Sequence, residues 1–498
     1  MRLYELLTPW LTTPLAPQWN IEFNDLVLDS RQVSTGDLFV ALIGHQQDGR
    51  AFIDAAIAQG AVAVITEHDH LAVLSVHGAV PVIGLPQLST ALSQLGLTAY
   101  PAARQARLIG VTGTNGKTTV TQLCAQLLTE LGQVAGVMGT VGNGVWGQLQ
   151  PSVNTTSDAL TVAKQLNAQV QAGADVVALE ISSHGLTQGR VAALPIEVAV
   201  FTNLSRDHLD YHGDMASYAA AKRRLFSQPD LQTAVLNGDD EYGQRWLLEL
   251  QAQGLDTICY TIDGAAGAEG TRWLRASQVH YHGQGICAEI DGSFGQGQLQ
   301  LPLLGAFNLA NTLAAMAALL AQGHNLSALL QAVTKLRPAD GRMETFGQAH
   351  GPMLVVDYAH TPDALQQALQ ALRLHCHGRL WCVFGCGGDR DRGKRPLMAA
   401  AAEQGADHLV ITADNPRSET FEAIVADMQT GLTQAPYLIE ADRPSAVRQA
   451  YALADAADVI LLAGKGHEDY QLIAGQVLPY SERQLAQQLT QSLVESGL

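Results

Sequence analysis

The sequence predicts an α/β protein with three domains. These are a small N-terminal α/β domain, a central P-loop-type domain whose mainly parallel sheet has helices on both faces, and a C-terminal Rossmann-like α/β domain. The chain has 498 residues, too many for one hydrophobic core, and a prior of about 150 residues per domain gives about three domains. From residue 107 onwards, short apolar runs alternate with helical patterns, as in sheets covered on both faces. We therefore expect domains at residues 1–97, 107–336 and 337–498.

Composition disfavours several classes of protein. Hydrophobic residues make up 47% of the chain, which is ordinary for a globular protein, and no segment reaches the ~20 uninterrupted apolar residues of a membrane span. The formal net charge of −18 disfavours nucleic acid as a partner, because a phosphate backbone requires a basic surface. Six scattered cysteines indicate free thiols in a reducing compartment. Since Met1 to Glu5 lack the pattern of a secretion signal, we expect a cytoplasmic protein without a membrane span, and a monomer suffices for the chemistry predicted below.

The first 97 residues are expected to form a small mixed unit. Strands and one helix are predicted in the order 25–31 (strand), 37–42 (strand), 51–59 (helix), 61–65 (strand) and 80–83 (strand). The polar loops at 28–31 and 44–50, taken alone, are more typical of loops that face water than of binding sites. The stretch 98–106, which contains Pro101, is expected to be a linker.

A phosphate-binding loop is predicted where the second domain begins. The apolar run Leu108 to Val111 is a strand candidate, and it leads through Gly113-Thr114-Asn115-Gly116-Lys117-Thr118-Thr119 into a helical pattern with one apolar face. In such an arrangement backbone N–H groups and the positive helix end face an anion, the lysine supplies a mobile cation, and a threonine hydroxyl can ligate Mg²⁺. The common P-loop pattern would place its first glycine at Val111, whereas Gly110 lies one residue too early. The alternative is a glycine-rich loop with an incidental lysine, but a nucleotide site is the better interpretation.

Polar residues follow two further strands of this domain. The run Asp175 to Glu180 places Glu180 at its carboxyl end, and the run Val198 to Asn203 does the same for Asn203. Because ligands of such sheets lie beyond the carboxyl ends of the strands, we expect these side chains to converge near Lys117.

The last part of the chain repeats the alternation of strands and helices after a β-rich insertion at 259–303 and a helix at 304–320. Strands are predicted at 353–358, 380–385, 408–412 and 459–463. The loop Gly385 to Arg390 is mostly glycine followed by charge, and polar loops also follow the last two strands. A second doubly wound unit of ~160 residues is therefore expected.

Together these motifs resemble those of the Mur ligases, whose form of the phosphate loop accounts for the displaced glycine. The other matching segments, spread over all three domains, are Asn154-Thr155-Thr156, Glu180-Ile181-Ser182-Ser183-His184-Gly185, residues 202–212, Gly305-Ala306-Phe307-Asn308, Gly341-Arg342-Met343-Glu344, Asp357-Tyr358-Ala359-His360-Thr361-Pro362 and Asp414-Asn415-Pro416-Arg417. The last of these resembles the form in members that add meso-2,6-diaminopimelate, whereas lysine-adding relatives lack the arginine.

The resemblance implies an ATP-dependent ligase of peptidoglycan precursor synthesis, with Mg²⁺ as cofactor. ATP would phosphorylate the side-chain carboxylate of D-Glu in UDP-N-acetylmuramoyl-L-alanyl-D-glutamate (UDP-MurNAc-L-Ala-D-Glu). An amine of meso-diaminopimelate would then attack the acyl phosphate and form an amide. Such a reaction requires charge neutralisation, in-line positioning and the exclusion of water.

The resemblance also implies roles for individual residues. Catalysis falls on Lys117, Glu180, His208 and Lys222, and Mg²⁺ ligation on Thr118, Glu180, His208 and a carbamylated Lys222 (N6-carboxylysine). ATP binding falls on Gly113, Thr114, Asn115, Gly116, Lys117, Thr118, Thr119, Asn308, Arg342 and Asp357. The uridine end of the substrate would contact Leu28, Ser30, His45, Gln46 and Gln47, and its sugar–peptide part Asn154, Thr155, Thr156, Ser182, Gln188 and Arg190. The amino acid would contact Arg390, Asp414, Asn415, Pro416, Arg417, Gly464 and Glu468.

Physical chemistry supports these assignments unequally. Hard cations favour oxygen ligands, so Glu180 is the firmer Mg²⁺ ligand and His208 rests on the resemblance. Lys222 by itself would be taken for part of a solvated basic run, since lysines are rarely buried. A guanidinium matches a carboxylate in a bidentate manner, so Arg417 is expected to select the second carboxylate of diaminopimelate. Without the resemblance, Asn308, Arg342 and Asp357 could equally be ordinary polar loop residues.

Three alternatives remain open. A lysine-adding ligase of the same family is disfavoured by Arg417. Folylpolyglutamate synthase shares the fold and reaction type, but the first domain and residues 414–417 do not suit it. A nucleotide-dependent binding protein without ligase activity is disfavoured by the joint presence of Glu180, His208 and Lys222.

Overall fold

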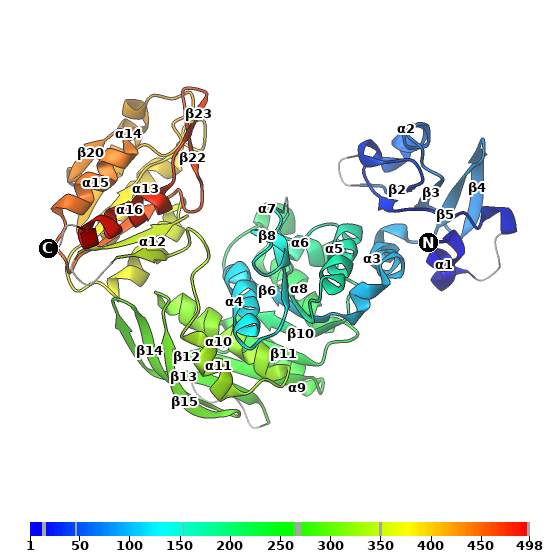
Figure 1. Ribbon diagram of the computed structural model, residues 1–498, viewed down its shortest axis with the longest axis horizontal. Helices are drawn as coiled ribbons and strands as arrows, with labels where there is room; N and C mark the ends of the chain where they lie inside the picture. Colours follow the sequence, from blue (N-terminus) through cyan, green and yellow to red (C-terminus); the bar gives the residue numbers. More distant parts are fainter. Residues whose placement is uncertain are drawn as a thin grey trace. The chain divides into compact units, whose positions relative to one another are not determined.

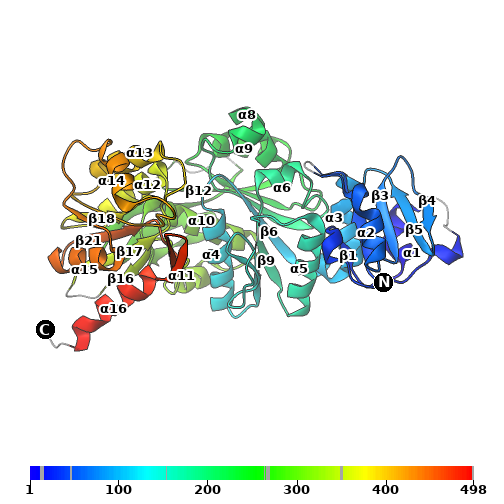
Figure 2. The same cartoon turned by 90° about the horizontal axis from the view of Figure 1, so that it is seen from above.

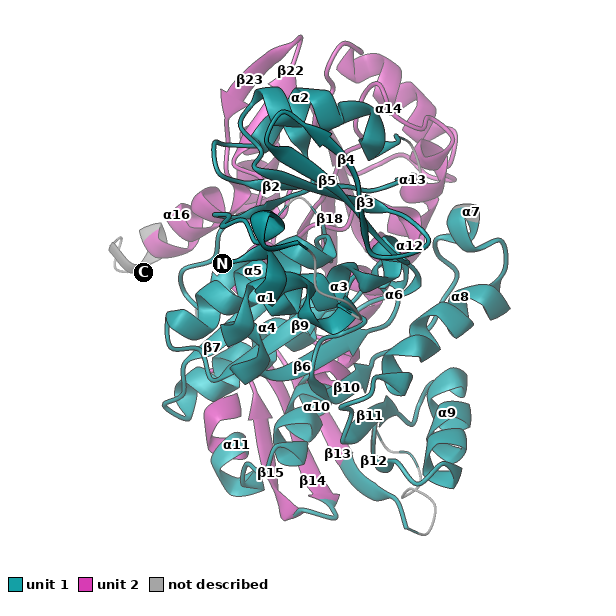
Figure 3. Cartoon of the chain, turned by 90° about the vertical axis from the view of Figure 1, so that its right-hand side faces the viewer, with its two compact units in different colours: residues 1–275, 292–294, 312–329 teal, residues 276–291, 295–311, 330–498 magenta. Residues whose placement is uncertain are grey.

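The computed structural model describes residues 1–11, 16–44, 47–152, 154–262, 264, 270–347 and 351–495. It divides into two compact units, which Figure 3 colours separately: unit 1 contains residues 1–275, 292–294 and 312–329, and unit 2 contains residues 276–291, 295–311 and 330–498. Both units are built on mainly parallel sheets with helices, which confirms the predicted fold class. The three domain boundaries themselves stay a prediction.

The first sheet of unit 1 has five strands in the order β1-β2-β3-β5-β4. Figure 1 labels β2, β3, β4 and β5 of this sheet. Only β4 is antiparallel to its neighbour. The elements of this part are α1 (Leu3–Leu7), β1 (Leu26–Val27), β2 (Leu38–Ala41), α2 (Ile53–Ala58), β3 (Ala63–Glu67), β4 (Ala72–His77), β5 (Val80–Leu85) and α3 (Leu88–Ala99). The long strand predicted at 25–31 is wrong, because the Asp29 carboxylate accepts a hydrogen bond from Arg31 N and caps a 3-10 turn at Ser30–Gln32. The edge strand β4 was not predicted.

The stretch 98–106 is not a free linker, contrary to expectation. It contains the end of α3 and a 3-10 helix, Pro101–Gln105, whose Ala103 is fully buried. Ala102 N donates to Asn167 Oδ1 on α5 (Ala159–Gln171) at 3.1 Å. Proline is favoured in the first turn of a helix, and small side chains let the segment pack closely. The chain is therefore ordered where composition alone indicated flexibility.

The central sheet of unit 1 carries the phosphate loop. Seven of its strands lie in the order β12-β11-β10-β6-β9-β7-β8, and β6 pairs in parallel with both β10 and β9. The phosphate loop follows β6, Glu180 ends β9, and Asn203 follows β10. The carboxyl ends of these three strands therefore lie side by side, with β6 in the middle, as predicted. The remaining elements are β6 (Arg107–Thr112), α4 (Lys117–Glu130), β7 (Ala135–Gly139), β8 (Gly142–Val145), β9 (Val176–Glu180), α6 (Ser183–Thr187), β10 (Ile196–Phe201), α7 (Leu209–His212), α8 (Met215–Arg223), β11 (Thr233–Asn237), α9 (Glu241–Ala252) and β12 (Asp256–Ile262).

The predicted β-rich insertion and the helix after it are both present. The insertion consists of β13 (Arg272–His282), β14 (Gly285–Gly292) and β15 (Gly295–Leu301), followed by α10 (Ala306–Ala321) and α11 (Leu326–Val333). These strands are neighbours in that order. All six cysteines are free thiols, as expected. Within the described ranges, no helix combines the length and the apolar character needed to cross a bilayer.

Unit 2 contains a six-stranded sheet in the order β16-β17-β21-β18-β19-β20, parallel except for β16. Its elements are β16 (Glu344–Phe346), β17 (Met353–Asp357), α12 (Pro362–Arg373), β18 (Leu380–Phe384), α13 (Lys394–Gly405), β19 (His408–Thr412), α14 (Phe421–Gln429), β20 (Leu438–Glu440), α15 (Arg443–Leu453), β21 (Val459–Ala463), a hairpin of β22 (Tyr470–Ile473) and β23 (Gln476–Pro479), and α16 (Glu482–Glu495).

The helices of unit 2 cover both faces of this sheet. Alternate strand residues such as Val355 and Cys382 form a core with α12, α13 and α14, whereas Val356 and Val383 form a second core with α15 and α16. Figure 2 shows the two groups of helices on opposite sides of β17 and β18. This is the doubly wound arrangement that the alternating pattern predicted.

Candidate active site

The phosphate loop follows β6 and leads into α4, as predicted. Gly113 has φ +153°, and a Cβ at this position would lie 1.9 Å from Thr202 Oγ1. Gly116, which precedes the helix, has φ +84°. Asn203, the second residue after β10, holds the loop: its carbonyl accepts from Thr114 N at 2.8 Å and its Oδ1 accepts from Asn115 N at 3.0 Å. Glycine is thus required for space and conformation, and the predicted convergence of Asn203 on the loop is confirmed.

Two lysine amines meet at one carbonyl of this loop. Lys117 Nζ donates to Gly113 O at 3.0 Å and to Thr114 O at 2.9 Å, and Lys222 Nζ, from α8, donates to Gly113 O at 2.7 Å. Lys222 is only 1% exposed, so its interpretation as part of a solvated basic run is wrong. Burial, and then the positive charge of Lys117, lower the pKa of Lys222 to about 6. At neutral pH Lys222 is therefore mainly an uncharged amine.

Glu180, at the end of β9, has its carboxylate within a set of hydroxyl and amide donors. Oε2 accepts from Thr118 Oγ1 at 2.9 Å and from Thr140 Oγ1 at 3.2 Å, while Oε1 accepts from Thr140 N at 2.9 Å. A Cβ on Gly139 would lie 2.0 Å from Oε1, so glycine is needed to admit the carboxylate. Burial raises the pKa of Glu180 against the opposing effect of these hydrogen bonds and of Lys117. Thr118 and Glu180 together offer the hard oxygen donors that Mg²⁺ prefers.

His208, a further predicted metal ligand, lies in a cluster of aromatic rings. Its ring lies edge-on to those of His184 and Tyr218, with centroids 5.1 and 6.1 Å away, and its side chain is about half exposed. Lys222 Nζ lies 4.5 Å from the centroid of the Tyr218 ring, so His208 and Lys222 flank the same aromatic residue. Among the residues with described positions, no three His, Cys, Asp or Glu side chains form a metal-binding group. Of the four predicted ligands, Thr118 and Glu180 are hydrogen-bonded to each other, and His208 and Lys222 both lie beside Tyr218.

Five of the six residues predicted for the sugar–peptide part of the substrate, all but Asn154, form one network around the end of β9. Thr155 Oγ1 lies at hydrogen-bond distance, 3.0 Å, from Thr140 Oγ1. Thr156 Oγ1 donates to Glu180 O at 2.9 Å and accepts from Ser182 N at 3.0 Å. Further members of this network are Gln188 and Arg190, whose side chains hydrogen-bond each other while Arg190 also donates to the Thr156 carbonyl. The Asn154 carbonyl accepts from Ser152 Oγ. A role for Thr140 was not predicted from the sequence. Thr140 follows the buried strand β7, so the rule that ligands lie at strand ends could have found it.

The residues predicted for the uridine end lie in the N-terminal part of unit 1. Leu28 packs against the hydrophobic core of this N-terminal part, and Ser30 is buried. The Gln47 carbonyl accepts from Gly44 N at 2.9 Å. His45 and Gln46 lie outside the described residues.

In unit 2, the three predicted ATP contacts are held mainly by backbone groups and by one ring. Asp357 accepts from Met343 N and Ala359 N, both at 2.8 Å, and burial raises the pKa of its carboxyl. The Arg342 guanidinium lies 4.7 Å from the centroid of the Tyr358 ring. Asn308 is buried at the start of α10, where its Nδ2 donates to Leu304 O at 2.8 Å.

The residues predicted to bind the amino acid gather around a lysine that sequence reasoning missed. Lys465 is fully buried, and its Nζ donates to Asn415 Oδ1 at 2.8 Å and to Glu468 Oε2 at 2.9 Å. It also forms an ion pair with Asp414 Oδ1 at 3.4 Å. Gly464, with φ +109°, precedes it. The available signal was a glycine on each side of a lysine directly after a buried strand.

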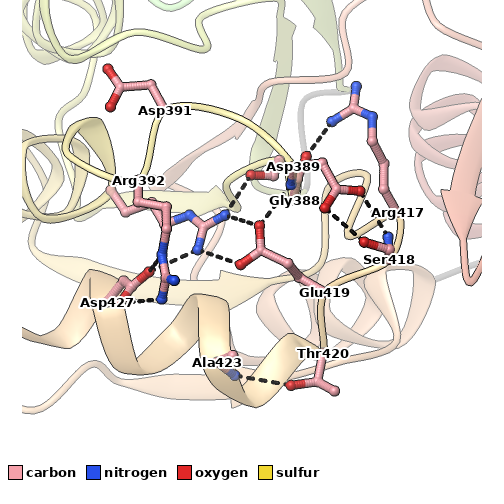
Figure 4. Close-up of polar contacts among 12 residues, drawn as sticks. Gly388, Asp389, Asp391, Arg392, Arg417, Ser418, Glu419, Thr420, Ala423 and Asp427 are labelled. Carbon is pink, nitrogen blue, oxygen red and sulfur yellow. Dashed lines mark hydrogen bonds and ion pairs between the residues drawn. The ribbon is translucent and has the colours of Figure 1, made fainter.

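Arg417 lies in a second group of contacts, between the loops that follow β18 and β19 (Figure 4). Its φ is +54°, and its Nη1 donates to Gly388 O at 2.7 Å. A Cβ on Gly388 would lie 1.8 Å from Pro416 O, so the two loops interlock at this glycine. Arg390, also predicted to bind the amino acid, is exposed on the loop that follows β18.

A phosphate loop on a mainly parallel sheet, together with a second doubly wound unit that has its own polar loops at the strand ends, defines a nucleotide-using enzyme of several α/β domains. Family models confirm this class and narrow it: the Mur ligase family catalytic domain matches residues 22–100, the Mur ligase middle domain residues 111–319, and the Mur ligase glutamate ligase domain residues 341–466. The chain belongs to the Mur ligase family.

Individual relatives are similar over nearly the full chain. A UDP-N-acetylmuramoyl-L-alanyl-D-glutamate–2,6-diaminopimelate ligase of Vibrio vulnificus (strain YJ016) is 52% identical over 493 residues, 98% of each chain. A solved structure of a ligase of the same name is 38% identical, with a TM-score of 0.78 over 99% of each chain. A MurF ligase from Thermotoga maritima, solved in complex with ADP, shares the fold at 17% identity, with a TM-score of 0.61 over 97% of this chain and 100% of that one.

Proposed function

We propose that this protein is an ATP-dependent ligase that adds meso-2,6-diaminopimelate to the D-Glu side-chain carboxylate of UDP-MurNAc-L-Ala-D-Glu, a step of peptidoglycan precursor synthesis. The observation that carries the proposal is Arg417, on the same loop as Asp414 and Asn415, in a chain 52% identical to a diaminopimelate-adding ligase. A guanidinium supplies what a second carboxylate requires and what lysine as a substrate would not use. The protein acts as a cytoplasmic monomer.

Phosphoryl transfer belongs to the phosphate loop. An oxygen of the D-Glu carboxylate attacks the γ-phosphorus of ATP, the bond to the bridging oxygen breaks, and ADP leaves. Lys117 and the N–H groups at the start of α4 offset the negative charge on the phosphates. Thr118 and Glu180 would hold Mg²⁺, which when bound supplies further neutralisation of phosphate and carboxylate charge.

Lys222 is the residue proposed to be carbamylated. A pKa of about 6 leaves its amine mainly uncharged at neutral pH, and nucleophilic attack on CO₂ requires the uncharged form. The nitrogen bonds to the carbon of CO₂ and a proton is released to solvent, so that a buried amine becomes a carboxylate beside the phosphate loop. The modified side chain would add a second carboxylate to a region where Glu180 provides the first, with His208 as the further proposed ligand.

Amide formation belongs to the loops of unit 2. The α-ammonium of diaminopimelate must lose a proton before its nitrogen attacks the acyl carbon, after which phosphate leaves. Asp414 and Glu468 are the acceptors for ammonium groups, Arg417 takes the distal carboxylate, and Arg390, Asn415, Pro416 and Gly464 complete the proposed contacts. Asn308, Arg342 and Asp357 are proposed to bind ATP. The rest of the nucleotide substrate is assigned to Leu28, Ser30, His45, Gln46 and Gln47 and to the network around Thr156.

One assay tests the proposal. Purified protein with ATP, Mg²⁺ and UDP-MurNAc-L-Ala-D-Glu receives either meso-diaminopimelate or lysine, and the amide product and released phosphate are quantified. We expect product with diaminopimelate and far less with lysine. Comparable product with lysine would refute the specificity, and no product with either amino acid would refute the ligase.

A further inference from the structure

An ion pair between a buried arginine and a partly exposed glutamate connects the two loops that hold Arg417. Arg395, from the first turn of α13, has a fully buried side chain. Glu419 lies two residues after Arg417 (Figure 4). Its Oε1 lies 2.6 Å from Arg395 Nη2. We infer that Arg395 and Glu419 form a positioning pair that fixes Arg417, and that they thereby set the preference for an amino acid with a distal carboxylate. This inference rests on the proposed function.

The contacts of Arg395 are directional. Its Nη1 donates to Glu419 Oε2 at 3.0 Å and its Nη2 to Glu419 Oε1 at 2.6 Å, which is the bidentate geometry of a guanidinium with a carboxylate. Nη1 also donates to Asp427 Oδ2 at 2.7 Å, and Nη2 to the Gly387 carbonyl at 3.1 Å. One guanidinium thus contacts both the loop after β18 and the chain that follows Arg417.

Glu419 makes the second connection between the same two loops. Its Oε1 also accepts from Asp389 N at 2.6 Å, and its own backbone N donates to Pro416 O at 3.0 Å. The Asp389 carboxylate in turn accepts from Ser418 N at 3.1 Å and Ser418 Oγ at 2.7 Å. The Gly388 carbonyl lies between Gly387 and Asp389, so its position is fixed from both sides.

The position of Arg417 depends in two ways on the contacts that Arg395 and Glu419 make with the two loops. The guanidinium of Arg417 is oriented by the Gly388 carbonyl, which the pair fixes. Its backbone has φ +54°, a left-handed conformation that a residue with a Cβ keeps only where its surroundings impose it. A shift of either loop would therefore move the guanidinium away from the substrate carboxylate.

Stability alone does not account for a buried guanidinium here. Apolar neighbours on the same helix, Met398 and Ala399, already belong to the core of this face. Buried ion pairs contribute little net stability compared with well-packed apolar residues, whereas their fixed geometry can specify one conformation. The pair is thus better suited to orient the loops than to strengthen the fold.

The test uses Glu419→Gln, which keeps the shape of the side chain and removes its charge, with Arg392→Gln as a matched control. Arg392 shares the partner Asp427, at 2.9 and 3.2 Å, but its side chain is 65% exposed and its hydrogen bonds in the described structure go to Asp427. The readout is the ratio of kcat/KM with diaminopimelate to kcat/KM with lysine. We expect Glu419→Gln to lower this ratio about tenfold by raising KM for diaminopimelate, while KM for ATP and KM for the nucleotide substrate stay unchanged. Arg392→Gln should leave the ratio and all three KM values unchanged.

Arg395→Lys is the second variant, because lysine keeps the positive charge but cannot make the bidentate contact of a guanidinium. Its ratio of kcat/KM with diaminopimelate to kcat/KM with lysine should lie between those of the wild type and Glu419→Gln. An unchanged ratio in folded Glu419→Gln, or unfolding of both variants, would overturn the inference and leave the proposed function intact if the wild type still discriminates. A wild type that makes no amide would overturn the proposed function, and the inference with it.

Discussion

Replacing Lys222 with methionine should stabilise unit 1 and abolish ligation. The folded chain holds the amine of Lys222 with a pKa near 6, whereas an ordinary lysine has a value of 10.5. Between these values the unfolded chain binds one more proton than the folded chain. Stability therefore rises with pH through this window, and the destabilising effect of Lys222 is largest at low pH and absent above the ordinary value.

The size of the effect follows from the same two values. The ordinary lysine pKa lies roughly 3.5 units above pH 7. At about 1.4 kcal/mol per unit, this difference sets an upper limit of about 5 kcal/mol on the destabilisation of the folded chain at pH 7. Methionine fills most of the same volume but loses the hydrogen bond to Gly113 O, worth about 1 kcal/mol. Gly113 O keeps Lys117 as a donor. A net gain of about 2–4 kcal/mol is expected.

Thermal unfolding in CO₂-free, Mg²⁺-free buffer at several pH values between 6.5 and 8.5 measures this. The Tm of Lys222→Met should exceed that of the wild type at pH 6.5, and the two should approach each other as pH rises. Lys335→Met, at an exposed lysine, should follow the wild-type curve. A Lys222→Met protein that melts below the wild type at every pH would refute the reasoning, and retained ligase activity would refute the role of the amine.

The remaining predictions concern both units. Arg417→Ala should raise KM for diaminopimelate at least about tenfold without changing KM for ATP, because one bidentate contact is lost; steady-state kinetics with each substrate varied will decide. Gly139→Ala should lower kcat, since its Cβ would lie 2.0 Å from Glu180 Oε1 and displace that carboxylate; unchanged Mg²⁺ dependence of the rate would count against this. Arg443→Met should destabilise unit 2 by about 3–5 kcal/mol, because it leaves Glu482 fully buried without its partner. The double variant Arg443→Met/Glu482→Leu should recover most of that loss in urea unfolding.

The sequence predicted most of the fold because its strongest signals are local. The buried strands around Val111, Leu179 and Leu461 are continuous apolar runs, and glycines mark the phosphate loop. Two errors have the same origin. Whether Lys222 faces water or the loop, and whether residues 98–106 are free or packed on α5, depends on tertiary contacts that no local pattern encodes.

Some residues have roles that were not predicted from the sequence, because these roles depend on tertiary contacts. Thr140 has no motif of its own, and it matters because its hydroxyl and amide both reach Glu180, forty residues later in the chain. Lys465 was part of a noted loop, yet its role emerged only from its three oxygen partners on two different loops. Arg395 is an ordinary helical arginine in sequence, because its partner carboxylates come from segments that fold next to it.

Both candidate sites follow from one property of parallel sheets. In unit 1, the phosphate loop, Glu180 and Asn203 follow β6, β9 and β10, which are neighbours with β6 in the middle. In unit 2, the loops that contain Gly388, Arg417 and Lys465 follow β18, β19 and β21, again neighbours, with β18 in the middle. Parallel strands bring their carboxyl ends to the same edge, and polar loops collect there because the strands themselves are buried and apolar. In each unit the middle strand leads into a glycine loop, and side chains from the flanking strand ends bind that loop: Asn203 in unit 1 and Arg417 in unit 2. The residues that hold the glycine loops are therefore as necessary to each site as the residues assigned to the ligands.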